Sequence, residues 1–264
     1  MLRSLKSLEG YRVGATDGLI GHVSDFYFDD EAWVVRYLIV DTGEAAHRRK
    51  VLISPISIQQ PDWTERIFPV YLTCDQVKNS PDIDTDKPVS RQQEMGYLGY
   101  YGYGKYWGGG GLWGAGLYPD IIQAGRQTTR DRGRSENGRQ RLDNPHLRSV
   151  NALLRYYVHA KDGDIGHVDG FLLEERTWAI RYLIVNTSNW WLGHDVLIAP
   201  EWIKEINWLD STVSIHLSRL SIKTAPPYDS TTVLDREQET NLHAHHGRNG
   251  DLPAPKRSLS AGSR

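Results

Sequence analysis

The sequence has a single cysteine, Cys74, and few of the residues that usually fill a core, with two methionines and four phenylalanines. One cysteine cannot form an internal disulfide, so nothing indicates an oxidising compartment. No stretch approaches the ~20 apolar residues that span a bilayer. The first ten residues, MLRSLKSLEG, also lack the apolar run of a signal peptide. We therefore expect a cytoplasmic protein without a transmembrane segment.

Catalytic motifs are missing as well. The sequence contains no HExxH, no paired-cysteine metal motif and no Ser/His/Asp spacing typical of a hydrolase. A four-glycine run at 108–111 is not followed by the Gly-Lys-Ser/Thr of a phosphate loop. His243, His245 and His246 could bind a metal ion weakly, but no carboxylate or thiol framework accompanies them. The sequence predicts a protein that is not an enzyme, with no catalytic residue, metal or cofactor.

What the sequence does contain is an internal repeat at a fixed offset of 145 residues. A gap-free comparison of residues 11–85 with 156–230 gives 27 identities in 75 positions. Three shared motifs stand out: DG-x-IGHV from Asp17 and Asp162, RYLIV from Arg36 and Arg181, and VLI-x-P from Val51 and Val196. Two copies are too few for a solenoid, so the repeat indicates a tandem duplication of one folding unit.

Each copy reads as a set of short strands. Runs such as WVVRYLIV at 33–40 are rich in β-branched and aromatic residues and have strand length. The Asp-Gly pairs at 17–18 and 162–163 predict hairpin turns. Gly21 and Gly166 suggest points where a strand bends or a neighbouring backbone approaches closely. Five or six short antiparallel strands per copy predict an all-β protein of two small β-barrels.

The three motifs resemble the PRC-barrel domain, named for the cytoplasmic barrel of the photosynthetic reaction centre H subunit. They are also similar to the barrel of the ribosome maturation factor, and the tandem arrangement resembles bacterial two-barrel members of the family. The resemblance covers residues 11–85 and 156–230, and together with the composition of the other segments it predicts a first barrel at 1–86, a linker at 87–150, a second barrel at 151–231 and a polar, disordered tail at 232–264. It implies a fold more than a function, because one small barrel hosts many roles.

The linker has two parts of different composition. Residues 96–118 contain ten glycines and eight tyrosines or tryptophans, which indicates either a flexible linker or an adhesive segment. A membrane-interface role for these aromatics is a further alternative. Residues Arg126 to Arg148 contain seven arginines, the only hint of nucleic-acid binding. The two barrel segments carry net charges of −5 and −4, which disfavours nucleic acid as a partner.

The second copy carries extra tryptophans that the first copy lacks, and these suggest a docking surface. The predicted partner-binding residues are Trp190, Trp191, Trp202, Tyr106, Trp107 and Trp113. His22 and His167, at matching positions, form a candidate pH-sensitive pair, with a backbone-bridging role as the alternative. Arg36 and Arg181 interrupt apolar strands and need a carboxylate partner, such as Asp17, Asp25 or Asp162, or an outward orientation.

The hypothesis that follows is a non-enzymatic interaction or scaffold protein that docks a protein partner. A homodimer, formed through a barrel or the aromatic segment, is one form of it. One alternative is an accessory subunit of a photosynthetic or electron-transfer complex, as the H-subunit resemblance implies. The other is an RNA- or ribosome-associated factor, which depends on the arginine stretch alone.

Overall fold

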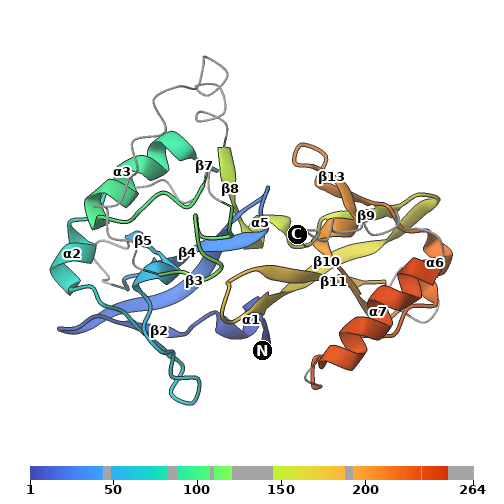
Figure 1. Cartoon of the computed structure of the whole chain (residues 1–264), viewed down its shortest axis with the longest axis horizontal. Coiled ribbons are helices and arrows are strands. Elements are labelled where there is room, and N and C mark those ends of the chain that lie inside the picture. Colours follow the sequence, from blue (N-terminus) through green and yellow to red (C-terminus); the bar gives the residue numbers. More distant parts are fainter. Residues whose placement is uncertain are drawn as a thin grey trace, which may run out of the picture. The chain divides into compact units, whose positions relative to one another are not determined.

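The computed structural model describes residues 1–43, 49–81, 88–107, 110–120, 145–187, 193–232 and 234–248. The chain divides into two compact units (Figure 1). Unit 1 comprises Met1–Leu154 and Phe171–Arg181, and unit 2 comprises Arg155–Gly170 and Tyr182–Arg264. The protein is mainly β, with two mixed sheets and a few short helices.

Each copy of the repeat contributes a similar series of elements. Those of the first copy are β1 (Leu2–Ser4), α1 (Leu5–Leu8), β2 (Arg12–Gly14), β3 (Leu19–Asp29), β4 (Val34–Asp41), β5 (Lys50–Ile53), η1 (Pro55–Ser57), β6 (Ile67–Pro69), α2 (Cys74–Lys78), β7 (Val89–Ser90) and α3 (Arg91–Tyr101). Those of the second copy are β8 (Pro145–Ser149), α5 (Val150–Leu153), β9 (Tyr157–Ala160), β10 (Gly163–Glu174), β11 (Ile180–Asn186), β12 (Asp195–Ile198), η3 (Pro200–Trp202), β13 (Ile203–Asn207), β14 (Thr212–Ile215), α6 (Arg219–Lys223) and α7 (Arg236–Arg248).

The two sheets have related strand orders. One runs β5-β4-β3-β2-β6, with β8 added to β3 and β7 to β8. The other runs β12-β11-β10-β9-β14-β13, with β1 added to β10. The prediction of purely antiparallel strands is wrong, because β2 pairs with β6 and β9 pairs with β14 in parallel. Within the described ranges each path ends on two different strands, so no closed barrel is seen.

Strand β4 is buried almost from end to end, which explains why its sequence does not alternate. One face packs on the sheet's own core. The other is covered by helix α3, whose Tyr97 joins a buried cluster with Tyr37, Ile39, Leu52 and neighbouring residues. A strand covered on both faces reads as a continuous apolar run. The unbroken apolar run WVVRYLIV is therefore explained by burial of both faces of the strand, one by the core and the other by a helix.

The predicted repeat is evident in backbone detail. Trp33 and Trp178 both have positive φ, 55° and 59°, as do the equivalent pair Arg66 and Ser211, 56° and 54°. A Cβ on Gly21 would lie 2.1 Å from the Asp41 carbonyl oxygen, and one on Gly166 would lie 1.9 Å from the carbonyl oxygen of Asn186. The prediction of close backbone approach at these two glycines is confirmed. Non-glycine residues with positive φ are uncommon, so their recurrence marks a copied backbone.

The copied segment is longer than the sequence comparison indicated. Leu2-Arg3-Ser4 of β1 recurs as Leu147-Arg148-Ser149 in β8, and helices α3 and α7 both begin at offset-related positions, Arg91 and Arg236. Ser90 and Gln93 form a capping box at the start of α3, and Asp235 and Gln238 exchange the same pair of hydrogen bonds at α7. The unit that was duplicated therefore includes a covering helix.

The short N-terminal strands are exchanged between the copies. Within unit 1, β1 pairs with residues 172–174 of β10, while β8 pairs with residues 27–29 of β3 in the equivalent register. A second reciprocal contact lies at Trp33 and its equivalent, Trp178. The Val35 amide donates to the Trp178 carbonyl at 2.8 Å, and the Ile180 amide donates to the Trp33 carbonyl at 2.7 Å. Unit 1 thus contains a local two-fold arrangement built from both copies.

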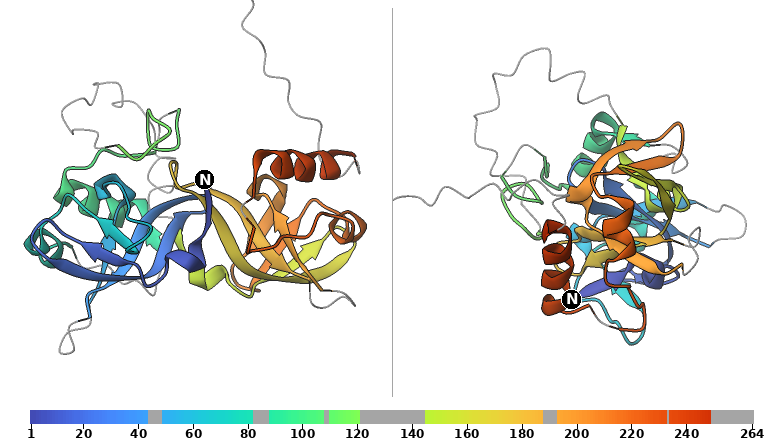
Figure 2. Two further views of the ribbon diagram at one scale, coloured as in Figure 1. Left: turned by 90° about the horizontal axis from the view of Figure 1, so that it is seen from below. Right: turned by 90° about the vertical axis from the view of Figure 1, so that its right-hand side faces the viewer.

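Two predicted irregular regions contain ordered elements. The predicted linker includes helix α3, and residues 110–120 fold back onto unit 1. The predicted disordered tail includes helix α7, drawn in red in Figure 2 on the outside of unit 2. Polar composition suggested a tail, but the Asp235 cap and the buried Leu242 and His246 hold the helix in place. The remaining tail, 249–264, lies outside the described residues.

Candidate functional site

A buried carboxylate lies beneath the aromatic segment of unit 1, which contains Tyr106 and Trp113. Glu94 of α3 is 1% exposed, and its Oε1 accepts a hydrogen bond from the Tyr37 hydroxyl at 2.5 Å. Its Oε2 accepts from the Tyr106 hydroxyl at 2.9 Å and lies 3.1 Å from Nε2 of His146. Burial raises the pKa of Tyr37 and Tyr106 well above the usual range of phenols. Both phenols are therefore held protonated, as donors to the carboxylate.

Arg36 lies next to this network and is almost fully buried. Its guanidinium stacks over the Tyr106 ring at 3.8 Å and over the Trp113 ring at 4.7 Å. Nη1 donates to the Leu112 carbonyl at 2.6 Å, and Nη2 lies 3.6 Å from Oδ2 of Asp29. Burial lowers the pKa of Arg36, and Tyr106 and Asp29 oppose that shift. Arg36 thus anchors the aromatic segment, and its carboxylate partner is Asp29 rather than Asp17, Asp25 or Asp162.

A hollow of about 250 Å³ adjoins Arg36, between Asp29, Glu31, Arg91 and Trp107. Arg91 lies 3.2 Å from the Glu31 carboxylate and 3.8 Å from that of Asp29. The two guanidinium charges are therefore balanced by two carboxylates within the same cluster. This balance favours a structural clamp over an anion-binding site.

The second copy keeps the helix attachment, but its described residues contain no equivalent of the Tyr106–Trp113 segment that covers Arg36. The Tyr182 hydroxyl donates to Oε1 of Glu239 at 3.0 Å, which repeats the Tyr37–Glu94 bond of the first copy. His243 Nε2 lies 3.2 Å from the same hydroxyl. The Arg36 equivalent, Arg181, is exposed, so it takes the predicted outward orientation.

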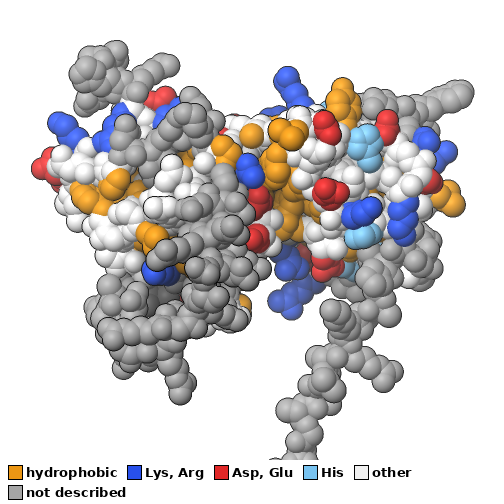
Figure 3. Space-filling model, turned by 90° about the horizontal axis from the view of Figure 1, so that it is seen from above, with side chains coloured by type: hydrophobic (Ala, Val, Ile, Leu, Met, Phe, Trp, Pro, Cys, Tyr) orange, Lys and Arg blue, Asp and Glu red, His pale blue; other side chains and the backbone are white. Residues whose placement is uncertain are grey.

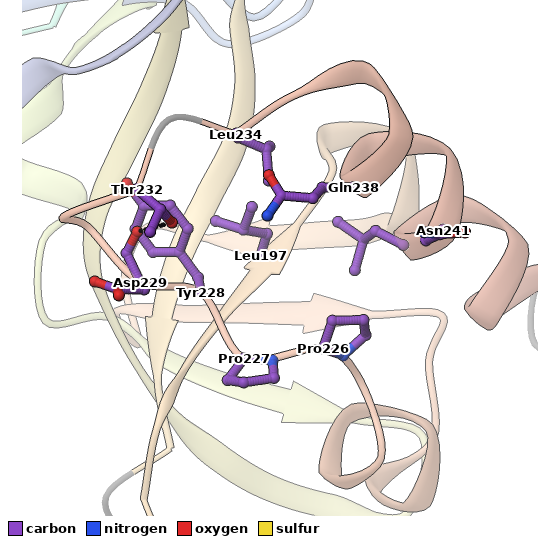
Figure 4. A pocket seen from close by; sticks show the side chains of 10 residues that line it. Leu197, Pro226, Pro227, Tyr228, Asp229, Thr232, Leu234, Gln238 and Asn241 are labelled. Carbon is purple, nitrogen blue, oxygen red and sulfur yellow. Dashed lines mark hydrogen bonds between the residues drawn. The ribbon is translucent and has the colours of Figure 1, made fainter.

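A pocket of about 290 Å³ opens under α7 in unit 2 (Figure 4). Leu197 forms its floor, Leu234, Gln238, Asn241 and Leu242 bound it from the helix side, and the loop Pro226–Asp229 with Thr232 closes the other side. The lining is apolar with a few amide and hydroxyl groups, and Asp229 is its one ionisable carboxylate. A cavity of this composition suits a small neutral group.

In the first copy, the residues equivalent to Leu197 and Leu242 contact each other directly. Leu242 of α7 corresponds to Tyr97 of α3, and Leu197 of β12 corresponds to Leu52 of β5. The Tyr97 side chain is 1% exposed, and its hydroxyl donates to the Leu52 carbonyl. At this lining position the second copy has a smaller side chain than the first, while the first-copy equivalents of Pro227–Asp229 and Thr232, residues 82–84 and 87, lie outside the described residues.

Of the six predicted docking aromatics, four are described, and three of these four are buried. Tyr106, Trp113 and Trp202 are 4%, 2% and 1% exposed, because the first two enclose Arg36 and the third packs under α7. Trp107 is half-buried beside Arg91. Trp190 and Trp191 lie outside the described residues, as does 126–144 of the arginine stretch. Arg148, at the end of that stretch, pairs with Asp30 at 3.1 Å.

The predicted histidines lie in different environments. His22 is exposed in unit 1 and His167 is half-buried in unit 2. In the tail, His246 is fully buried and its ring packs against Trp202 with centroids 4.6 Å apart. Its Nδ1 lies 2.8 Å from the Ser221 hydroxyl. Across the described ranges no three potential ligands are grouped as a metal ion would require.

Sequence reasoning missed Glu94, His146 and the α7 pocket. The signal that could have found the carboxylate is the recurrence of Gln93-Glu94 as Gln238-Glu239, at the same offset of 145 but beyond the region compared. His146 follows the arginine stretch and has no histidine equivalent, since its counterpart is Met1. No pattern in the sequence distinguishes it from a loop residue.

Comparison with known protein families and with curated proteins finds no match to this chain. Of the helices described, none combines the length and apolar character required to cross a membrane. On the face shown in Figure 3, acidic and basic side chains are intermixed rather than gathered by sign. Among the described side chains of that face there is therefore no single-sign patch of the kind that attracts nucleic acid.

Proposed function

We propose that this protein is a non-enzymatic interaction protein, made of two PRC-type barrel copies, that docks a protein partner at the α7 pocket of unit 2. The observation that carries the proposal is the difference between the copies. Both retain the capped helix and the Tyr–Glu bond that attaches it to the sheet. The second has a pocket beside Leu242, whose equivalent in the first copy, Tyr97, donates a hydrogen bond to the Leu52 carbonyl.

The reactive groups of the described residues support a binding role over catalysis. Ser221 and His246 form a hydroxyl–imidazole contact at 2.8 Å, but they are 1% and 0% exposed, so a substrate would not reach them. Desolvation, together with the neighbouring Asp17, raises the pKa of the Cys74 thiol. A raised thiol pKa disfavours the nucleophilic thiolate.

The PRC-type assignment is supported by the three shared motifs and by the recurrence of one strand order in both copies. In this interpretation the sheet provides a rigid base, and the helix above it defines the binding position. Sites on rigid elements hold their geometry better than sites on loops.

Affinity capture with a matched pair of variants tests the proposal. Asn241 lines the pocket and is exposed on α7, so Asn241→Arg should obstruct the opening without disturbing the core. Thr240→Arg adds the same charge at the adjacent exposed residue, which does not line the pocket. A partner captured by the wild-type full chain and by Thr240→Arg, but weakened tenfold or more by Asn241→Arg, would support the proposal. Equal binding to all three proteins would refute it.

A further inference from the structure

We infer that the α7 pocket recognises a phenol ring, presented as a tyrosine side chain by the partner protein. This inference deepens the proposed function and depends on it for the source of the tyrosine. The first copy serves as the template, because there a tyrosine of the protein itself lies between the covering helix and the edge strand.

The template is defined by contacts of Tyr97. Its ring meets Tyr37 edge-to-face with centroids 5.0 Å apart, and its hydroxyl donates to the carbonyl of Leu52. Around it lie Leu52 and Val89 of the same buried cluster. The second copy retains apolar residues at both positions, Leu197 and Leu234, and both line the pocket.

The hydrogen-bond acceptor is retained as well, because the register of the two edge strands is the same. Ile39 pairs with Leu52, and Ile184 pairs with Leu197. In both copies the threonine just after the inner strand donates its amide to the outer strand, from Thr42 to Arg49 and from Thr187 to His194. Hydrogen-bonded pairs alternate along an antiparallel ladder, so the Leu52 and Leu197 carbonyls both point away from the inner strand. A phenol in the pocket could donate to Leu197 as Tyr97 does to Leu52.

The rest of the lining is uncharged except for Asp229. Pro226, Pro227 and Leu242 provide apolar contacts, Tyr228 and Thr232 add hydroxyl groups, and Gln238 and Asn241 lie on the helix above (Figure 4). The volume, about 290 Å³, is at the lower limit of small-molecule sites, which run from roughly 300 Å³ upward. One ring therefore fits better than an extended ligand.

Ligand-observed NMR with the full-length chain tests the chemistry directly. We expect saturation transfer to p-cresol, which mimics the tyrosine side chain, and about fivefold weaker binding of toluene, which lacks the hydroxyl. Leu242→Tyr should fill the pocket as Tyr97 does and weaken p-cresol binding at least tenfold, with no loss of thermal stability. Asn241→Arg, an exposed substitution, provides a second block if Leu242→Tyr fails to fold. Equal binding of p-cresol and toluene, or p-cresol binding unaffected by a folded blocking variant, would overturn the inference.

The two proposals fail in distinguishable ways. If the captured partner binds wild type and Leu242→Tyr equally but is lost with Asn241→Arg, docking holds and the tyrosine inference is wrong. If p-cresol binds selectively but pocket variants leave the partner unaffected, the phenol site stands as a small-molecule site and protein docking there is wrong. Replacing each tyrosine of the bound partner segment by phenylalanine then provides the direct check. At least one replacement should weaken binding several-fold, and no effect from any of them would contradict the inference.

Discussion

Replacing Tyr97 by leucine should make the first copy resemble the second, and the cost can be worked from the contacts of that side chain. The substitution removes the hydrogen bond to the Leu52 carbonyl, worth about 1 kcal/mol. It also removes ring contacts with Tyr37 and Tyr101, whose centroids lie 5.0 and 4.8 Å away. Each aromatic pair contributes about 0.5–1.5 kcal/mol, so the total loss is about 2–4 kcal/mol.

Urea unfolding followed by tryptophan fluorescence measures this loss as a shift of the midpoint, of about 1–2 M for a slope near 2 kcal/mol per molar urea. Tyr71→Leu is the matched control, the same substitution in the same unit at a residue that is 60% exposed. It should cost less than about 1 kcal/mol. Equal losses from the two variants, or a loss below about 1 kcal/mol for Tyr97→Leu, would show that the contacts of Tyr97 between α3 and β5 do not stabilise the first copy.

Three further measurements test other parts of unit 1 and the shared backbone. Burial raises the pKa of Tyr37, Tyr97 and Tyr106 above the ordinary value near 10. The stability that these buried, protonated phenols contribute is therefore present below pH 10 and is lost as the pH rises further. These three tyrosines alone should lower the free energy of unfolding by about 4 kcal/mol per pH unit there, and Tyr106→Phe should reduce the slope by about 1.4 kcal/mol; an unchanged slope would contradict the assignment. Arg36→Met should cost about 3–5 kcal/mol in denaturant unfolding because it leaves Asp29 buried with a weakened ion pair, whereas a cost under 1 kcal/mol would mean the clamp is dispensable. Gly21→Ala and Gly166→Ala should each lower the yield of folded protein sharply, since a Cβ would meet a carbonyl oxygen at about 2 Å; wild-type circular dichroism and melting would show that the backbone moves easily.

The repeat and its strands could be predicted because they depend on local signals. Each copy repeats the turn, the close-approach glycine and the apolar run, and the prediction of a close backbone approach at Gly21 and Gly166 is confirmed. Helix α3 was missed for a physical reason. Glycine and tyrosine have modest helix propensity, so GYLGYYGYG reads as a linker, while tertiary packing of Tyr97 and Leu98 holds the helix.

The strand exchange could not be predicted from sequence at all. Leu2-Arg3-Ser4 and Leu147-Arg148-Ser149 are identical tripeptides, so the two possible pairings have the same local chemistry. Which of β3 and β10 each tripeptide pairs with must therefore depend on the chain connections on either side of it. The candidate site was equally hidden, because a pocket arises from a missing side chain, Leu242 where the first copy has tyrosine, and the surrounding residues remain ordinary.

The exchanged strands have a consequence for the history of the molecule. Strand β1 pairs with β10 of the second copy, and β8 pairs with β3 of the first. Each copy therefore has a strand in its sheet that comes from the other copy. An ancestor with a single copy would have had to exchange its first strand with that of a second molecule to form the same pairings. Within one polypeptide both strands are always available, and the two copies differ where Tyr97 of the first corresponds to Leu242 of the second.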